Sequence, residues 1–164
     1  MLNRSNRHRQ RILWAVALIV GLSGCFATSR RFDKPQGQPA TSDVAGTYGL
    51  DDATLKSMRE EGGYSNLLDT KLVLRPDGTA EMTNMPDWWG RFGGSNKGYF
   101  SGLGQWKVDR DVGSGQWVLF LFMPNEYQSL DLKGSMPPYK IFTFVGDPDS
   151  GMSMTFVKIA EASN

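Results

Sequence analysis

Two residue types that often do chemistry in proteins, cysteine and histidine, are scarce in this chain and lie near its start. The chain contains one cysteine, Cys25, and one histidine, His8. A thiolate is a nucleophile and a metal ligand, and an imidazole can accept or donate a proton near neutral pH. Cys25 closes the segment Leu22-Ser23-Gly24-Cys25 directly after an apolar run, so the neighbouring sequence decides what its thiol does.

An export signal precedes Cys25. The residues before the apolar run contain no acid and four arginines, Arg4, Arg7, Arg9 and Arg11. A basic start, an apolar run over 12–22 and then small residues are typical of a secretory signal peptide. The run is shorter than the 20 or so residues that span a bilayer. We therefore predict that residues 1–24 are a removed signal peptide, the alternative being an uncleaved membrane anchor.

The end of the apolar run resembles the lipobox of bacterial lipoproteins, with Leu22, two small residues and then Cys25. In that family, a diacylglyceryl group is attached to the cysteine sulfur and the peptide is cut before the cysteine. The resemblance implies lipidation of Cys25 and membrane attachment through that lipid. An Asp after the cysteine would favour inner-membrane retention; Phe26 stands there, which implies the periplasmic side of the outer membrane if the organism is Gram-negative. An ordinary cleaved signal peptide is the alternative.

Composition excludes several classes of function for the remainder. The chain has 18 Lys and Arg against 17 Asp and Glu, and four of the arginines lie in the signal peptide. No basic surface for nucleic acid is therefore expected on the remainder. Without histidine or a free thiol, Ser-His-Asp and Cys-His catalysis and His-ligated metals are excluded. We predict no enzyme, cofactor or metal. A hydrolase that uses only carboxylates is the exception, and its candidates are Asp51, Asp52, Asp77, Glu81, Asp87 and Glu126.

Two regions follow the signal. Residues 25–43 hold the acylated cysteine and then a stretch of Pro, Gly, Gln, Ser and Thr without periodicity, which predicts a flexible tether. Residues 44–164 are long enough for one domain with its own core.

Hydrophobic periodicity in this domain predicts a mainly β fold. Strands are expected over 44–50, 71–75, 79–85, 104–110, 116–123, 139–145 and 152–159. One short helix over 53–61 is expected after the first strand, with Asp51 as its cap and Gly62 as its stop. Pro76-Asp77-Gly78 predicts a tight turn. A polar loop is expected around Leu130 and Leu132, and 116–123, apolar on both faces, is expected to be covered on both sides or to line an interior.

About seven strands with short turns predict an antiparallel meander that forms a small barrel. The chain resembles the lipocalin-like class of small envelope barrels at Gly46-Thr47-Tyr48, at 72–79 and at 104–108. A Tyr stands at position 48, where a lipocalin has Trp. The class binds apolar ligands, enzymes or envelope partners.

The segment 86–103 combines aromatic residues with glycines and predicts a long irregular loop. Such a loop suits a lid or a contact surface for an apolar ligand, a glycan or an envelope protein. The alternative is a loop whose aromatic side chains fold back and plug one end of the barrel. The candidate ligand- or partner-binding residues are Trp88, Trp89, Phe92, Tyr99 and Phe100.

The segment Asp147-Pro148-Asp149-Ser150-Gly151 begins like a calcium loop, but Lys158 stands where the bidentate Glu of such a loop belongs. We predict a turn in which Asp side chains cap backbone amides.

Together these features predict a membrane-anchored envelope lipoprotein with a non-catalytic binding or structural β domain. The alternative is a periplasmic enzyme inhibitor or immunity-type lipoprotein.

Overall fold

The computed structural model describes residues 33–87, 98–124 and 126–160 of the chain, and two helices and a 3-10 turn accompany its strands. The helices are α2 (Thr41–Val44) and α3 (Asp52–Glu60), and the turn is η1 (Pro148–Ser150). Within these ranges the strands are β1 (Gly46–Leu50), β2 (Lys71–Leu74), β3 (Thr79–Pro86), β4 (Tyr99–Arg110), β5 (Trp117–Met123), β6 (Glu126–Lys133), β7 (Lys140–Phe144) and β8 (Ser153–Ala160).

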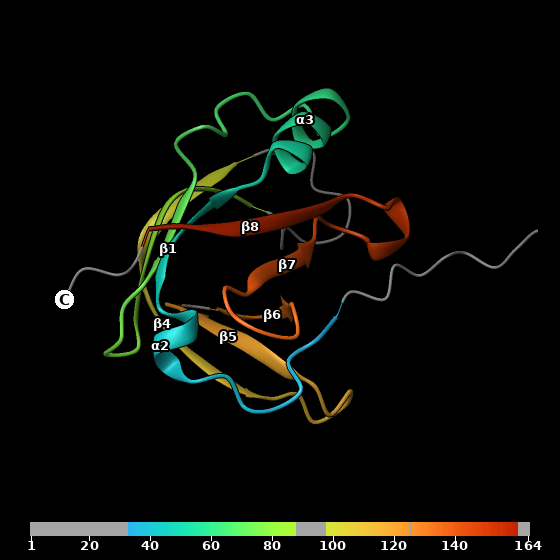
Figure 1. Ribbon diagram of the computed structural model, residues 1–164. Coiled ribbons are helices and arrows are strands. Elements are labelled where there is room, and N and C mark those ends of the chain that lie inside the picture. Colours follow the sequence, from blue (N-terminus) through green and yellow to red (C-terminus); the bar gives the residue numbers. More distant parts are fainter. Residues whose placement is uncertain (1–32, 88–97, 125, 161–164) are drawn as a thin grey trace, which may run out of the picture. The chain divides into compact units, whose positions relative to one another are not determined.

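The strands form a closed antiparallel barrel in which each strand pairs with the next one along the chain and β8 pairs with β1 (Figure 1). The predicted mainly β meander and its closure into a small barrel are confirmed. The strand that the sequence missed is β6, where a polar loop was expected. Only Leu130 and Leu132 of β6 are buried, so its inward face gives a weak periodic signal.

The inside of the barrel is apolar because the residues that pair across neighbouring antiparallel strands point to the same face. Every strand contributes buried side chains to one hydrophobic core. The main contributors are Tyr48, Leu72, Leu74, Met82, Trp106, Leu119, Leu121, Leu130, Leu132, Ile141, Met154 and Phe156.

The segments on either side of β1 add further side chains to this core. Val44, at the end of α2, and Ala45 are buried, and the hydroxyl of Tyr48 donates to the carbonyl of Val44 over 2.7 Å. On the other side of β1, Met58 from α3 and Leu67 from the following segment are buried in the same cluster. The core therefore extends beyond the inward faces of the strands.

The predicted short helix is present as α3. The Asp51 carboxylate accepts a hydrogen bond from the Thr54 amide over 2.8 Å, as expected for an N-cap. The Thr54 hydroxyl accepts a bond from the Thr155 amide over 2.9 Å, which ties α3 to β8. Gly63, rather than Gly62, has the positive φ, at 66°, that ends such helices.

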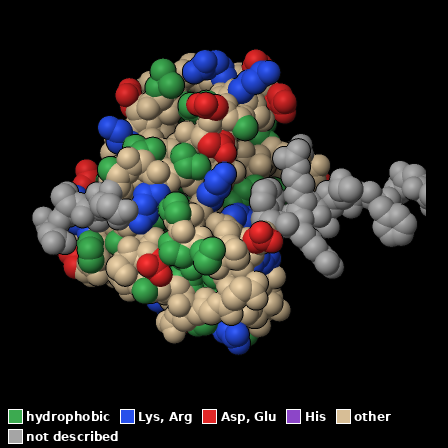
Figure 2. All heavy atoms as spheres, viewed as in Figure 1, with side chains coloured by type: hydrophobic (Ala, Val, Ile, Leu, Met, Phe, Trp, Pro, Cys, Tyr) green, Lys and Arg blue, Asp and Glu red, His purple; other side chains and the backbone are tan. Residues whose placement is uncertain are grey.

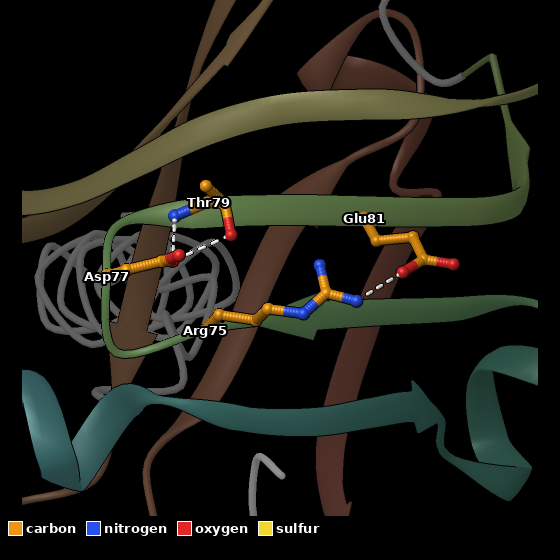
Figure 3. Close-up of polar contacts among 4 residues, drawn as sticks. All are labelled: Arg75, Asp77, Thr79 and Glu81. Atoms are coloured by element: carbon orange, nitrogen blue, oxygen red, sulfur yellow. Dashed lines mark hydrogen bonds and ion pairs between the residues drawn. The ribbon is translucent and has the colours of Figure 1, made fainter. Parts of the chain in front are cut away.

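The predicted turn between β2 and β3 is also present (Figure 3). Asp77 accepts hydrogen bonds from the Thr79 amide over 2.9 Å and from its hydroxyl over 2.7 Å, and these bonds lower the pKa of the Asp77 carboxyl. Arg75 and Glu81 form an ion pair of 2.6 Å across the hairpin. The indole of Trp106 donates to the Arg75 carbonyl over 2.8 Å, which attaches the turn to β4.

Residues 33–43, which the sequence assigned to the flexible tether, contact the barrel. The Asp33 carbonyl accepts a hydrogen bond from the Gly134 amide over 2.6 Å. The Lys34 ammonium donates to the side chain of Gln116. Pro39 is buried, and α2 begins two residues later. A tether predicted to reach residue 43 is therefore contradicted over this part of its length.

The calcium-like segment forms the predicted turn. The Asp147 carboxylate accepts a bond from the Asp149 amide over 2.9 Å at the start of η1, and Gly151 adopts a φ of 74° after it. In the described ranges, no cluster of three or more His, Cys, Asp or Glu residues could hold a metal ion.

Candidate functional site

The predicted aromatic segment begins and ends inside strands. Pro86 pairs with Tyr99 and Met85 pairs with Phe100, and the Asp87 amide donates to the Gly98 carbonyl over 3.2 Å. The expected irregular loop over 86–103 is therefore wrong at both ends, because β3 reaches Pro86 and β4 already starts at Tyr99. The predicted residues Trp88, Trp89 and Phe92 lie outside the described residues, as does Cys25.

An irregularity in β3 allows this extended pairing. The register between β3 and β4 shifts between Met82 and Met85, and Asn84 has a positive φ of 50°. Such a bulge inserts an extra residue and re-aims the strand. The Asn84 amide donates to the Ser101 hydroxyl over 2.8 Å, and its carbonyl accepts from the Thr70 hydroxyl over 2.9 Å. These side-chain bonds replace part of the interrupted ladder.

Tyr99 acts as a clamp at the start of β4. Its hydroxyl accepts hydrogen bonds from the amides of Ser65 and Asn66, over 3.1 and 3.0 Å. Its ring meets the ring of Tyr64 edge-on, with 5.9 Å between centroids. The hydroxyl of this predicted binding residue is therefore used to hold the segment after α3 against the barrel.

Tyr64 connects the same segment to the end of β3. Its hydroxyl donates to the Asp87 carboxylate over 3.1 Å. Burial raises the pKa of Tyr64 to about 12, and the negative charge of Asp87 and the hydrogen bond to it act in the same direction. At neutral pH, Tyr64 is a protonated hydrogen-bond donor and cannot serve as a base.

Phe100, the other predicted residue within the described part of the chain, packs against the hydrophobic core. Its ring lies over Gly102, where an added Cβ would come within 2.7 Å of the ring. The structure places Tyr99 and Phe100 next to each other at the start of β4. Phe100 packs against the core, whereas Tyr99 stays partly exposed and holds the segment after α3.

A second apolar surface, which the sequence did not predict as a site, lies on the outside of the barrel. We call it the outer aromatic face and define it as Phe120 and Phe122 of β5, Tyr127 of β6, and Phe142 and Phe144 of β7. Tyr127 is 63 % exposed, Phe144 is 43 % exposed and Phe122 is 36 % exposed, whereas Phe120 is half-buried and Phe142 is buried. Of the two expectations for 116–123, lining an interior is met by Leu119 and Leu121, whereas cover on both sides fails at the exposed Phe122. The sequence feature that could have indicated this surface is that every outward position from Val118 to Phe122 is apolar.

The rings of this face contact one another in two separate groups. Phe120, Phe122 and Tyr127 have centroids 6.3–6.4 Å apart, and Phe142 meets Phe144 edge-on at 5.2 Å. Mutual contact limits the rotamers of the side chains, so the face is a preformed surface. On the view in Figure 2, hydrophobic side chains lie in small groups among charged ones.

Two lysines lie over the rings of this face. The ammonium of Lys107 is 5.7 Å from the centroid of Phe120, and that of Lys133 is 4.5 Å from the centroid of Phe142. Lys107 pairs with Asp109 at 2.8 Å, and Lys133 pairs with Asp131 at 3.0 Å. The hydrogen bond from Lys107 lowers the pKa of Asp109. The lysine charges near the rings are therefore balanced by carboxylates.

Five of the six carboxylates considered for catalysis have structural partners, and the sixth, Asp52, lies in the first turn of α3. Asp51 caps α3, Asp77 closes a turn and Asp87 accepts from Tyr64. Glu81 pairs with Arg75, and Glu126 accepts from Gln128 over 2.8 Å. These five acids lie in separate contacts, none of which joins two of them.

Among the helices of the described chain, none combines the length and the apolar character that a membrane span needs. In comparisons with protein-family models, curated proteins and solved structures, nothing matches this chain.

Proposed function

We propose that the protein is a lipid-anchored lipoprotein of the bacterial envelope whose β-barrel binds a ligand or partner without catalysis. The observation that carries the proposal is the position of Cys25, the one cysteine of the chain, at the end of a lipobox-like segment. Two or three acyl chains give stable anchoring where a single chain does not. Phe26 after the cysteine favours the outer membrane, facing the periplasm, in a Gram-negative organism.

The contacts at the start of the domain support this arrangement. Asp33 and Lys34 hydrogen-bond to Gly134 and Gln116 on the barrel. Only residues 26–32 then remain between the proposed lipid and the barrel, and they span about 25 Å when fully extended. The barrel would stay close to the membrane surface.

The proposed binding region is the end of the barrel where β3 and β4 are joined. This region rests on Asp87, Gly98 and Tyr99. The Asp87 amide bonds to the Gly98 carbonyl, and the side chains of Asp87 and Tyr99 bond to the segment after α3. Trp88, Trp89 and Phe92 follow Asp87 in sequence and supply aromatic groups suited to an apolar ligand, a glycan or an envelope protein. The absence of histidine after the signal and the structural partners of the acids favour binding over catalysis.

Metabolic labelling tests the anchor. Cells that express the full chain would be grown with labelled palmitate, and the intact mass of the mature protein would be measured. We expect label and a mass that starts at acylated Cys25, and neither in a Cys25→Ser variant. A mature protein that is cut elsewhere and carries no lipid would contradict the proposal.

Binding is tested by native mass spectrometry of the mature protein extracted from its own membrane. We expect a co-purifying ligand or partner that is lost in a Trp88→Ala/Trp89→Ala variant and kept in a Leu68→Ala control, which removes an exposed apolar side chain elsewhere. Unchanged binding with lower thermal stability would assign the tryptophans to packing. A single enzyme bound in equal amounts would instead favour the inhibitor class.

A further inference from the structure

We propose that the outer aromatic face of β5, β6 and β7 lies against the bilayer that holds the lipid anchor, an inference that rests on the proposed lipidation of Cys25. The barrel would then lie with one flank on the membrane surface. It would not hang free at the end of a linker.

The apolar character of this flank is the first support. Single exposed apolar side chains are common, whereas a contiguous exposed group marks a contact surface. Phe122 and Tyr127 are paired neighbours on β5 and β6, and Phe144 lies on the next strand. Met136, in the connection between β6 and β7, is also exposed, at the end of these strands opposite to Phe122, Tyr127 and Phe144.

The opposite flank differs. The outward positions of β2 and β3 include the exposed Lys71 and Thr83 and also Glu81, which forms an ion pair with Arg75 directly after β2. In the closed strand order, β2 lies four strands away from β6, and β3 lies four strands away from β7. A barrel that contacts a bilayer would therefore turn the β5–β7 side toward it.

The start of the domain lies beside the same strands, at the end opposite to Phe122 and Tyr127. Asp33 is bonded to Gly134, next to the end of β6, and Lys34 is bonded to Gln116, next to the start of β5. A coil of the length of residues 26–32 has a root-mean-square span of about 15 Å. The anchor would therefore enter the membrane close to the flank that carries the aromatic side chains. At so short a range, a tethered surface has an effective concentration on the order of millimolar, so a weak contact suffices.

The charges beside the outer aromatic face indicate which kind of lipid surface it would contact. The ammonium groups of Lys107 and Lys133 lie over the rings of Phe120 and Phe142 and are paired with Asp109 and Asp131. Because the pairs are neutral, the contact should depend on the headgroup and acyl boundary more than on anionic lipid. A phosphatidylethanolamine surface therefore fits this face.

A single fluorescent label tests the contact. Since the thiol of Cys25 would be acylated, a cysteine introduced elsewhere is the one free thiol of the mature chain. Ser129→Cys places a label inside the outer aromatic face, where Ser129 is exposed and pairs with Phe120. Thr83→Cys places the matched control on the opposite flank. Both lipidated proteins would be put, one copy each, into phosphatidylethanolamine nanodiscs that carry nitroxide-labelled lipid.

We expect quenching at position 129 to be about threefold stronger than at position 83, since interfacial surfaces enter the headgroup region by about 5–10 Å. The difference should persist at high salt. It should disappear in a Phe122→Ser/Tyr127→Ser background and remain in a Leu68→Ser background. The comparison of the two labels in the otherwise unchanged protein does not depend on whether the double variant folds.

The possible failures are distinguishable. Equal quenching at both positions, in protein whose intact mass shows acylated Cys25, would overturn the membrane contact and leave the lipoprotein in place. Protein without the acyl group would overturn the proposed function itself, together with this inference. A signal at position 129 that arises only when several copies share a vesicle would assign the face to contacts between copies, and would also overturn the membrane contact.

Discussion

The hydroxyl of Tyr64 donates a hydrogen bond to the carboxylate of Asp87 over 3.1 Å, and this bond joins the segment after α3 to the end of β3. The two residues are far apart in sequence but lie at the base of the proposed binding region. The bond therefore helps to set where the chain leaves β3.

Removal of the phenolic hydroxyl should weaken this end of the barrel. We expect Tyr64→Phe to lower the free energy of unfolding by about 1 kcal/mol, because a hydrogen bond to a charged acceptor is lost. Denaturant unfolding of Tyr64→Phe, Asp87→Asn and the double variant gives the coupling between the two groups. Strictly additive losses would show that the bond does not contribute.

Alkaline pH should also lower the stability of the fold through Tyr64. Because the folded pKa of Tyr64 is about 12, above the ordinary value of 10.0, folding favours the protonated phenol. This contribution is complete below pH 10 and is lost as the pH rises from 10 toward 12. Unfolding measured at pH 9 and pH 11 should therefore show a larger loss in the natural protein than in Tyr64→Phe. Equal losses in the two proteins would argue against the raised pKa.

The clamp formed by Tyr99 can be separated from ligand binding. In Tyr99→Phe, the amides of Ser65 and Asn66 lose their acceptor while the ring stays. We expect faster hydrogen exchange over 61–70 and unchanged binding of the ligand or partner. Phe122→Leu, on the outer aromatic face, serves as the control with unchanged exchange over 61–70. Lost binding without faster exchange would restore Tyr99 as a contact residue.

The close approach of Gly104 to a neighbouring strand predicts that alanine destabilises the protein far more at position 104 than at position 49. A Cβ at Gly104 would lie 2.3 Å from the Phe122 carbonyl oxygen, whereas one at Gly49 would lie 3.6 Å from the end of the Ile159 side chain. We expect Gly104→Ala to lower the unfolding free energy by about 2 kcal/mol or more, as overpacking does, and Gly49→Ala to change it little. Thermal unfolding of both variants checks the contrast, and a stable Gly104→Ala protein would contradict the β4–β5 register.

Local chemistry was readable from the sequence alone. Apolar alternation identified β2, β3 and β8, and the predicted turn at Asp77 and the predicted helix cap at Asp51 are both present. These features depend on residues close together in the chain, whose types set the backbone conformation directly. The lipobox-like segment at Cys25 is local in the same sense, although its lipidation stays a prediction.

The side of each strand that meets water was decided only by the closed barrel. Phe120 and Phe122 look like core residues in sequence, yet pairing with Lys107 and Tyr127 places them outside. Tyr99 looks like a binding residue, yet its hydroxyl meets the amides of Ser65 and Asn66 from a distant segment. Burial and hydrogen-bond partners depend on strand register and on contacts between segments far apart in the chain, and local periodicity does not contain that information.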